Sequence, residues 1–408
     1  MPTLLPRRRR YLALFLLLIF TFTLILHRKW IRRLLKIRPP EVQYPASILK
    51  QELDSLIAQP PTTLQNSSMI SAFKPGIPNE PGYNYTKTIV VPKLKAEDTS
   101  WLDEELPDVP KTIYVVDDEQ ASLRPPKNKG REAMVYLSYI VDFYDSLPDI
   151  SIFAHAHRWA WHNNDLLDKD MAMVIRHLNL ERVIREGYMN LRCHWYPGCP
   201  GWLETHAEEK DQEKEEELLV AAAWKDLFPT EPMPDVLAQP GCSQFALSRE
   251  RIRVLPKGEY ERLRQWLLTT KLKDSMSGRI FEYVWQWVWA GQSALCPSMH
   301  ECYCDGFGAC FDSDDECRRW FELRYYQRED DWNLIKWQIR SNAYALYMAR
   351  GDIDEADRVE RLDEEEMHDF RLRIDETWFE LAEKRDTAFA NGRDAQKKAR
   401  IMEKIKEQ

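Results

Sequence analysis

The chain has 408 residues, with 57 Lys and Arg against 66 Asp and Glu, which gives a formal net charge of −9. With 44% hydrophobic and 30% charged residues, the composition excludes a collagen-like, low-complexity or wholly disordered chain. The length allows one large domain with extensions, or two domains. The negative charge argues against a dedicated nucleic-acid binder, so we expect no nucleic-acid polymer as a partner.

The N-terminus predicts a membrane anchor. Four arginines at residues 7–10 precede an uncharged apolar run over residues 11–26, and basic residues follow it without a small-residue cleavage site. This pattern favours an uncleaved signal-anchor over a cleaved signal peptide. We therefore expect a cytosolic tail over residues 1–10 and a transmembrane helix over residues 11–27.

Two sequons set the expected orientation, because basic residues flank both sides of the apolar run and leave the charge rule undecided. Asn66 and Asn84 each begin an Asn-x-Ser/Thr sequence, which is glycosylated only on the lumenal side. The expected protein is single-pass and type II, with its bulk in the Golgi or ER lumen. Residues 28–87, rich in Pro, Ser, Thr and Asn, predict a lumenal stem.

The eight cysteines agree with a lumenal location. Their even number favours disulfides in an oxidising compartment, while a zinc site is the alternative for the spacing C-x-C-x5-C-x6-C after residue 301. Only one local pair is expected, between Cys193 and Cys199. The disulfide candidates are Cys193, Cys199, Cys296, Cys302, Cys304, Cys310 and Cys317.

The elements of a globular domain begin near residue 88. Short apolar runs at residues 88–91, 112–116 and 150–157 predict buried strands, and apolar residues at helical spacing predict an amphipathic helix over residues 131–145. The alternation of strands with a helix is typical of a parallel α/β sheet. The acidic and basic run at residues 208–217 is expected to be solvated.

The C-terminal region, residues 319–408, is charged and predicted to be helical. Met367, Phe370, Ile374, Trp378 and Leu381 recur at helical spacing. We expect this stripe to pack on the main domain, with a short coiled-coil seam as the alternative.

Histidines at the end of the third predicted strand are the first candidate site. If the strand extends through residue 157, His155 and His157 share one face by alternation, and His162 follows shortly after. Ligands of open parallel sheets bind at this edge. The three imidazoles could bind a divalent metal such as Mn²⁺ or Zn²⁺, act in acid–base catalysis, or hydrogen-bond the loop backbone.

Two further groups could contact a nucleotide donor. Asp117 and Asp118 close the second predicted strand, where acids hold ribose hydroxyls or a metal but are also common in turns. Lys129, Gly130 and Arg131 precede a predicted helix. The backbone and basic side chains there suit a diphosphate, although an ordinary loop leading into a helix explains them equally.

A later helix, expected over residues 280–289, carries a candidate base. Glu282 could deprotonate a hydroxyl, or it could be an ordinary salt-bridged residue. Trp285, Trp287 and Trp289 lie on the same element. Their indoles either fill the core or stack on a sugar.

Several strings in this chain resemble the largely fungal "domain of unknown function 3431" family. The similarity covers roughly half of the chain, from about residue 88 to residue 311. The strings are Asn128-Lys129-Gly130-Arg131-Glu132-Ala133, Leu147-Pro148-Asp149, Ile152-Phe153-Ala154-His155-Ala156-His157-Arg158, Trp161-His162-Asn163-Asn164-Asp165, Gly187-Tyr188-Met189-Asn190-Leu191-Arg192-Cys193, Gln244-Phe245-Ala246-Leu247-Ser248-Arg249, Ser277-Gly278-Arg279 with Glu282-Tyr283, and Cys302-Tyr303-Cys304-Asp305.

The layout of these strings is similar to a GT-A glycosyltransferase, in which His155-Ala156-His157 stands in the place of an Asp-x-Asp metal motif. The resemblance implies a single GT-A-like, Rossmann-like α/β domain over residues 88–318, between the membrane anchor and the helical C-terminal extension. It implies a nucleotide-sugar donor held by Asp117, Lys129 and Arg131, a glycan acceptor, and Glu282 or His162 as the catalytic group. A non-catalytic sugar-binding or assembly protein and a His-metal hydrolase are the alternatives.

Overall fold

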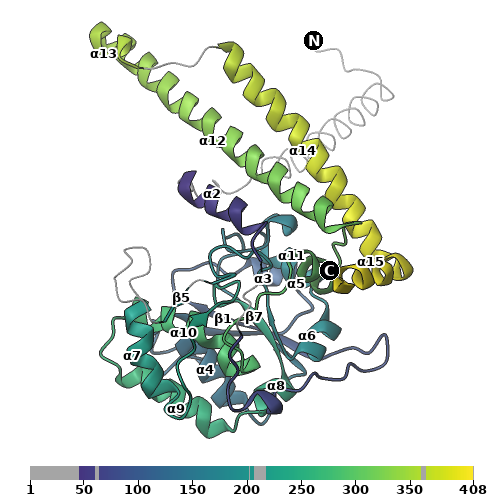
Figure 1. Cartoon of the computed structure of the whole chain (residues 1–408). Coiled ribbons are helices and arrows are strands. Elements are labelled where there is room, and N and C mark those ends of the chain that lie inside the picture. The colour runs from purple at the N-terminus through teal and green to yellow at the C-terminus, as the bar shows by residue number, and fades with distance from the viewer. Residues whose placement is uncertain (1–45, 60–63, 202, 206–216, 360–363, 408) are drawn as a thin grey trace, which may run out of the picture. The chain divides into compact units, whose positions relative to one another are not determined.

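The computed structural model describes residues 46–59, 64–201, 203–205, 217–359 and 364–407, all within one compact unit (Figure 1). The predicted cytosolic tail, the predicted anchor at residues 11–27 and most of the charge run at residues 208–217 lie outside the described residues. Among the helices of the described part, none is long and apolar enough to span a membrane.

A five-stranded mixed sheet forms the centre of the molecule, in the order β2-β1-β3-β7-β4. Strands β1 and β2 are parallel, as are β1 and β3, whereas β7 runs antiparallel to both β3 and β4. A two-stranded ladder lies apart from this sheet. The strands are β1 Lys87–Lys93, β2 Lys111–Val115, β3 Ile150–Phe153, β4 Tyr188–Asn190, β5 Leu203–Glu204, β6 Val236–Leu237 and β7 Phe245–Ser248.

The third predicted strand is shorter than expected, because it ends at Phe153 and not at residue 157. Phe153 is the last β3 residue paired with β1, and it faces Phe245, the first residue of β7. Beyond Phe153, β1 continues to Lys93 but β7 does not extend, and the chain leaves the ladder after Ala154 donates its backbone N–H to the carbonyl of Val90 at 3.1 Å. The prediction that His155 and His157 share a strand face is therefore wrong, and His155 donates its backbone N–H to Gln244 Oε1 at 3.1 Å.

Helices cover both faces of the sheet, because the alternating side chains of each strand feed two separate cores. Ile89 and Ile152 enter one core, whereas Val90 and Phe153 enter the other. The first core includes residues of α3 Trp101–Glu105, α5 Met171–His177, α6 Leu180–Glu186 and α11 Met299–Phe307. The second includes residues of α4 Glu132–Phe143, α7 Glu217–Leu227, α8 Arg249–Arg253, α9 Lys257–Thr269 and α10 Asp274–Ala290.

Part of the predicted stem packs against the α/β domain. Ser67 donates its backbone N–H to the carbonyl of Gly291 at 2.8 Å, and Gly76 donates to the carbonyl of Arg185 at 2.8 Å. The sequon residues Asn66 and Asn84 are both exposed. The segment contains the short helices α2 Ala46–Ser55 and η1 Ile70–Ala72, so its described residues are more ordered than a simple tether.

Three disulfides cross-link the second half of the α/β domain: Cys193–Cys302, Cys199–Cys296 and Cys304–Cys310. The expected Cys193–Cys199 pair is wrong, because each of the two cysteines meets a partner about a hundred positions later in the fold. Cys317 is also not in a disulfide. It is a buried thiol near the start of helix α12 (Asp314–Arg350) and belongs to the first apolar core.

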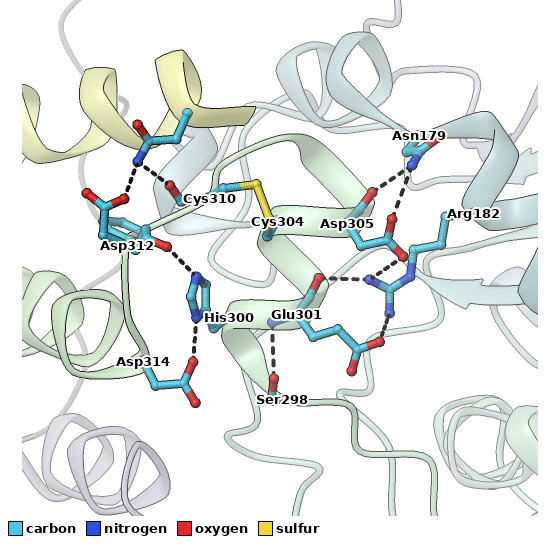
Figure 2. The surroundings of a disulfide bond; sticks show 12 residues. Asn179, Arg182, Ser298, His300, Glu301, Cys304, Asp305, Cys310, Asp312 and Asp314 are labelled. Atoms are coloured by element: carbon cyan, nitrogen blue, oxygen red, sulfur yellow. Dashed lines mark hydrogen bonds and ion pairs between the residues drawn. A yellow bond between two sulfur atoms is a disulfide. The ribbon is translucent and has the colours of Figure 1, made fainter. Parts of the chain in front are cut away.

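The Cys304–Cys310 disulfide lies at the end of α11, within a cluster of polar contacts (Figure 2). Asn179 donates to the carbonyl of Asp305 at 2.8 Å, and Arg182 donates to the carbonyl of Glu301 at 2.8 Å. His300 Nε2 lies 3.0 Å from the carbonyl of Phe311. These contacts fasten α6 and the segment after α11 to α11 itself.

The C-terminal region is helical, as predicted, and α12 and α14 lie side by side (Figure 1). Of the apolar stripe, Leu381 is buried in the first core, as expected, whereas Trp378 is 48% exposed, and α14 as a whole lies mainly against α12. Trp320 donates its indole N–H to the carbonyl of Leu381 at 3.0 Å. The helices are α12 Asp314–Arg350, α13 Ile353–Asp357, α14 Glu364–Arg393 and α15 Ala395–Glu407.

Candidate functional site

A cavity of about 350 Å³ lies beyond the carboxyl end of β3. Five parts of the chain surround it: the start of α4, the loop after β3, the loop after β4, the end of β6 with the loop that precedes β7, and the first half of α10. Its polar and aromatic lining includes Arg131, Glu132, His155, Trp161, His162, Gln239, Cys242, Arg279, Glu282 and Tyr283. This is the edge of the sheet at which open α/β proteins bind ligands.

Two imidazoles form a hydrogen-bonded pair in this cavity. His155 Nδ1 lies 2.8 Å from His162 Nε2, and the two rings are nearly perpendicular, with centroids 4.7 Å apart. Burial lowers the pKa of His162 to about 2, with further contributions from His155 and Arg192. Burial also lowers the pKa of His155. Both imidazoles are therefore neutral at physiological pH.

The second ring nitrogen of His155, Nε2, takes no part in the bond to His162. This atom is buried and makes no hydrogen bond to any residue that the structure describes. If Nδ1 donates to His162, this Nε2 carries a lone pair and is a hydrogen-bond acceptor. His162 then fixes the tautomer of His155, as the orienting group of a catalytic base does.

His157 lies apart from this pair. Its side chain is exposed, and its Nε2 is 3.4 Å from Glu97 Oε1 in the loop after β1. Within the described residues, no group of three or more His, Cys, Asp or Glu side chains is arranged to hold a metal ion. His155 and His157 thus do not form a ready chelate, and their metal role stays a prediction.

Two arginines and two glutamates bring charge to the cavity. Arg131 and Glu132 stand at the start of α4, and Arg279 and Glu282 lie one turn apart on α10. Gly278 lets α10 approach α4 closely, since a Cβ at this position would lie 3.1 Å from the carbonyl oxygen of Gly130. The close approach brings both charged pairs to one space.

Lys129 and Gly130 do not line the cavity. The ammonium group of Lys129 donates to the carbonyl of Thr270, and the backbone N–H of Gly130 donates to Asp274 at 2.5 Å. Both contacts face the connection between α9 and α10. Of the three basic-loop residues expected to bind a diphosphate, only Arg131 reaches the cavity.

Asp117 and Asp118 lie at the same edge of the sheet but outside the cavity. Asp117 accepts the backbone N–H of Lys95 at 2.7 Å, and Asp118 pairs with the ammonium of Lys95 at 2.8 Å. Strand β1 separates β2 from β3. The loop after β1 therefore supplies the partners of the acids that follow β2, as well as the partner of His157.

Three buried amides hold the loop that carries His162, and the sequence reasoning gave them no role. Gln244 donates to Asn163 Oδ1 at 2.9 Å, and Asn164 donates to the carbonyl of Leu191 at 2.7 Å. Asn164 Oδ1 also accepts the backbone N–H of Cys193 at 2.8 Å. Adjacent asparagines in an otherwise apolar stretch were the available signal, because buried amides need such partners.

The tryptophans of α10 belong to the core. Trp285 and Trp289 are fully buried and stack at 4.5 Å, and Trp287 is 4% exposed. Gln286 is also fully buried, and it donates to the carbonyls of Tyr283 and Ser293. The exposed indole at the cavity is Trp161, 36% exposed, on the loop after β3.

A comparison with protein-family models matches residues 89–305 to the family described as "Protein of unknown function (DUF3431)". The chain belongs to this family. The match covers more than half of the chain and includes every cavity-lining residue named above. No curated protein and no solved structure matches the chain.

The DUF3431 segment ends inside α11, so α12 to α15 lie outside it. The strings that carry the family resemblance meet in space. His162 and Asn163 contact His155 and Gln244, and Asn164 contacts the segment that ends at Cys193. In this chain the DUF3431 strings therefore form part of the cavity lining and of its supporting loops.

Proposed function

We propose that the chain is a single-pass, membrane-anchored lumenal glycosyltransferase-like enzyme. It transfers a sugar from a nucleotide-sugar donor to an acceptor hydroxyl. The supporting observation is the cavity at the sheet edge, in which two guanidinium groups, two carboxylates and a neutral imidazole pair line one space. Diphosphates and hydroxyls are the ligand groups that this combination recognises.

The donor diphosphate binds Arg131 and Arg279. Guanidinium groups match phosphate oxygens with paired hydrogen bonds, and they stabilise the negative charge that develops on the leaving nucleoside diphosphate. Lys129 and Gly130 do not contact the donor in this proposal. Their hydrogen bonds fix the start of α4, where Arg131 stands. Asp117 and Asp118 remain predicted nucleoside contacts at the neighbouring part of the edge.

The acceptor hydroxyl is activated by Glu282. Its carboxylate takes the hydroxyl proton while the acceptor oxygen attacks the anomeric carbon of the donor sugar. The bond from the anomeric carbon to the phosphate oxygen breaks, and the electron pair leaves with the nucleoside diphosphate. The His155–His162 pair holds a hydrogen-bond-accepting nitrogen in the same cavity. A divalent cation at His155 and His157 remains a prediction, and no step depends on it.

Two features support a lumenal location. The chain forms three disulfides, which persist in oxidising compartments and are rare in the cytosol. The sequon residues Asn66 and Asn84 are exposed and accessible to glycosylation.

The test is a thermal-shift screen of the purified full chain against UDP-, GDP- and CMP-sugars, followed by an assay for nucleoside diphosphate or monophosphate release. We expect one donor to raise the unfolding temperature and to be turned over. Glu282→Gln should lower turnover by roughly two orders of magnitude or more while donor binding persists, since a general base contributes about 10²–10⁴-fold. Arg279→Ala should weaken donor binding.

Glu250→Gln is the matched control, because Glu250 is an exposed glutamate on α8 outside the cavity. Its activity should equal that of the wild type. Donor binding without turnover would favour a non-catalytic sugar-binding protein. Stabilisation by Zn²⁺ alone, lost in a His155→Ala/His157→Ala variant, would favour a metal hydrolase and contradict the proposal.

A further inference from the structure

Two exposed tryptophans lie on the loop after β3, one of them at the cavity. Trp161 lines it and is 36% exposed, and Trp159, two residues earlier, is 40% exposed. The edge of the Trp161 ring meets His162, with centroids 5.3 Å apart. An indole at this place presents a flat apolar face beside the polar groups of the cavity, which is the arrangement that stacks on a ring-shaped ligand.

An arginine lies over each indole. Arg158 Cζ is 4.3 Å from the Trp159 ring centroid, and Arg192 Cζ is 4.9 Å from that of Trp161. The arginines themselves are held in place: Arg158 pairs with Asp170 at 2.7 Å, and Arg192 donates to the carbonyl of Tyr196 at 2.7 Å. The two rings are therefore pre-oriented, and a ligand that stacks on them immobilises little further.

The groups around Trp161 suit a ligand with an apolar face and a polar rim. Glu282 lines the same cavity and offers carboxylate oxygens to a hydroxyl, whereas the side chain of Gln239 accepts from the Tyr188 hydroxyl and donates to the carbonyl of Glu282. A pyranose ring has this shape, since its C–H groups cover one face and its hydroxyls surround the edge. A lipid surface would instead favour apolar neighbours over a cavity lined by carboxylates and guanidinium groups.

We propose that Trp161 and Trp159 form a saccharide subsite for an acceptor of at least two sugar rings. The ring that carries the reacting hydroxyl stacks on Trp161 inside the cavity, and the next ring contacts Trp159 outside it. The assignment of this saccharide as the acceptor rests on the proposed transferase function. The subsite itself depends only on the two indoles and their setting.

The test is oxidation of tryptophan by N-bromosuccinimide in the full chain, measured at each site by peptide mass spectrometry. The probes are mannose, glucose, galactose and N-acetylglucosamine, and the α1,6-mannotriose, cellotriose, β1,4-galactotriose and chitotriose that contain them. We expect one triose to protect both Trp159 and Trp161, and its monosaccharide to protect Trp161 alone. Trp378, which is 48% exposed on α14, is the internal reference and should react equally in every sample.

Variants give a second measurement. Trp161→Ala and Trp159→Ala should each weaken binding of the protecting triose by roughly three- to tenfold, the contribution of one aromatic contact, and Trp378→Ala should leave it unchanged. If no saccharide protects either indole, or if phosphatidylcholine–phosphatidylserine vesicles protect them and saccharides do not, the subsite is overturned.

The donor screen separates the two proposals. Donor binding without saccharide protection would leave the transferase proposal intact and overturn the subsite. Saccharide protection without any donor effect would support the subsite and overturn the transferase proposal.

Discussion

The His155–His162 pair illustrates how burial sets the protonation state of a site. Burial lowers the pKa of each imidazole, and for His162 the neighbouring His155 ring and Arg192 disfavour a positive charge further. The pair therefore remains neutral down to acidic pH, while the unfolded chain takes up protons on the same residues near pH 6.5. The folded state must lose stability as the pH falls through this region.

The expected pH dependence has a defined sign. Because the unfolded state binds more protons than the folded state below about pH 6.5, the free energy of unfolding should decrease as the pH falls, by up to about 1.4 kcal/mol per pH unit for each imidazole. His162→Gln removes one of these groups, so its urea-unfolding curve should change less between pH 6.5 and 4.5. If the free energy of unfolding of His162→Gln changed with pH as much as that of the wild type, the conclusion that both imidazoles are neutral in the folded state would be contradicted.

The sequence identified part of the site at this scale. His155, His162, Glu282 and Arg131 meet in the cavity, as the clustering of strand ends and helix starts suggested. The partners of Lys129 and of the aspartates after β2 could not be read from the sequence. These contacts join segments that are distant in the chain, such as Gly130 to Asp274, and their geometry depends on how α9 and α10 pack.

At the scale of elements, one wall of the cavity depends on a close backbone contact. Gly198 follows β4 and lies directly against the carbonyl of Gln239, so that a Cβ there would overlap the carbonyl oxygen. Gly198→Ala should displace this wall, lower the unfolding temperature and weaken ligand binding in the cavity. Gly201→Ala is the matched control, since its Cβ would meet only Val236 at an ordinary 3.5 Å. Equal behaviour of the two variants would argue against a rigid wall.

The C-terminal helices also reach the site. Arg328 on α12 lies 3.5 Å from Asp165, and the side chains are 7% and 4% exposed. Asp165 follows the loop that carries His162, and Arg385 on α14 pairs with Asp168 on the same segment at 2.7 Å. The helices outside the family segment thus fasten the loop that lines the cavity.

Removing one partner of the buried pair should be costly. Arg328→Ala should reduce the free energy of unfolding by about 3–5 kcal/mol, because it leaves the Asp165 carboxylate buried with less compensation. The control is Arg318→Ala on the same helix, whose ion pairs with Asp315 and Glu322 are solvent-exposed and should contribute little. Denaturant unfolding measures the free energy of unfolding of both variants. An equal loss in the two would show that the Arg328–Asp165 contact contributes no more than an exposed ion pair.

The lengths of the elements show where sequence patterns fail. The helix at residues 131–145 was predicted to within a few residues, because its apolar spacing is set locally. The third strand was extended too far, because β7 begins opposite Phe153 and the backbone of His155 bonds to the Gln244 side chain, contacts that the residues of the strand do not reveal. The helical stripe of α14 was recognised, but its partner α12 was not, since periodicity shows that a face is buried and not what covers it.

At the scale of the whole molecule, the disulfides close loops of very different lengths. Cys193–Cys302 joins residues 109 positions apart, whereas Cys304–Cys310 joins residues 6 apart. In the chain-entropy description, a loop of about 100 residues contributes about 4.7 kcal/mol and a short loop roughly half as much. The double substitution Cys193→Ser/Cys302→Ser should therefore destabilise the chain more than Cys304→Ser/Cys310→Ser.

Thermal unfolding of the two double variants measures this difference. Cys317 serves as a reporter in both, because its buried thiol should react with a maleimide only on unfolding. If the short-loop variant proved the less stable of the two, the contacts of α11 would outweigh loop entropy.

The overall class of the fold was predictable from alternating strands and helices, and the parallel pairing of β1 with β2 and β3 agrees with it. The antiparallel β7 was not predictable, because a four-residue apolar strand gives no signal of its direction or neighbours. The disulfide pairing could not be predicted either, because it depends on which loops the folded sheet brings together.

The late position of β7 in the chain constrains how the protein can be made. This strand lies between β3 and β4 in the sheet, yet it is synthesised after both of them. Until residue 248 has emerged, the nascent sheet has a gap between β3 and the edge strand β4, and both of these strands present unpaired edges. A nascent chain must keep these edges apart from other chains, so any truncation before β7 should yield an aggregating product and not a smaller folded domain.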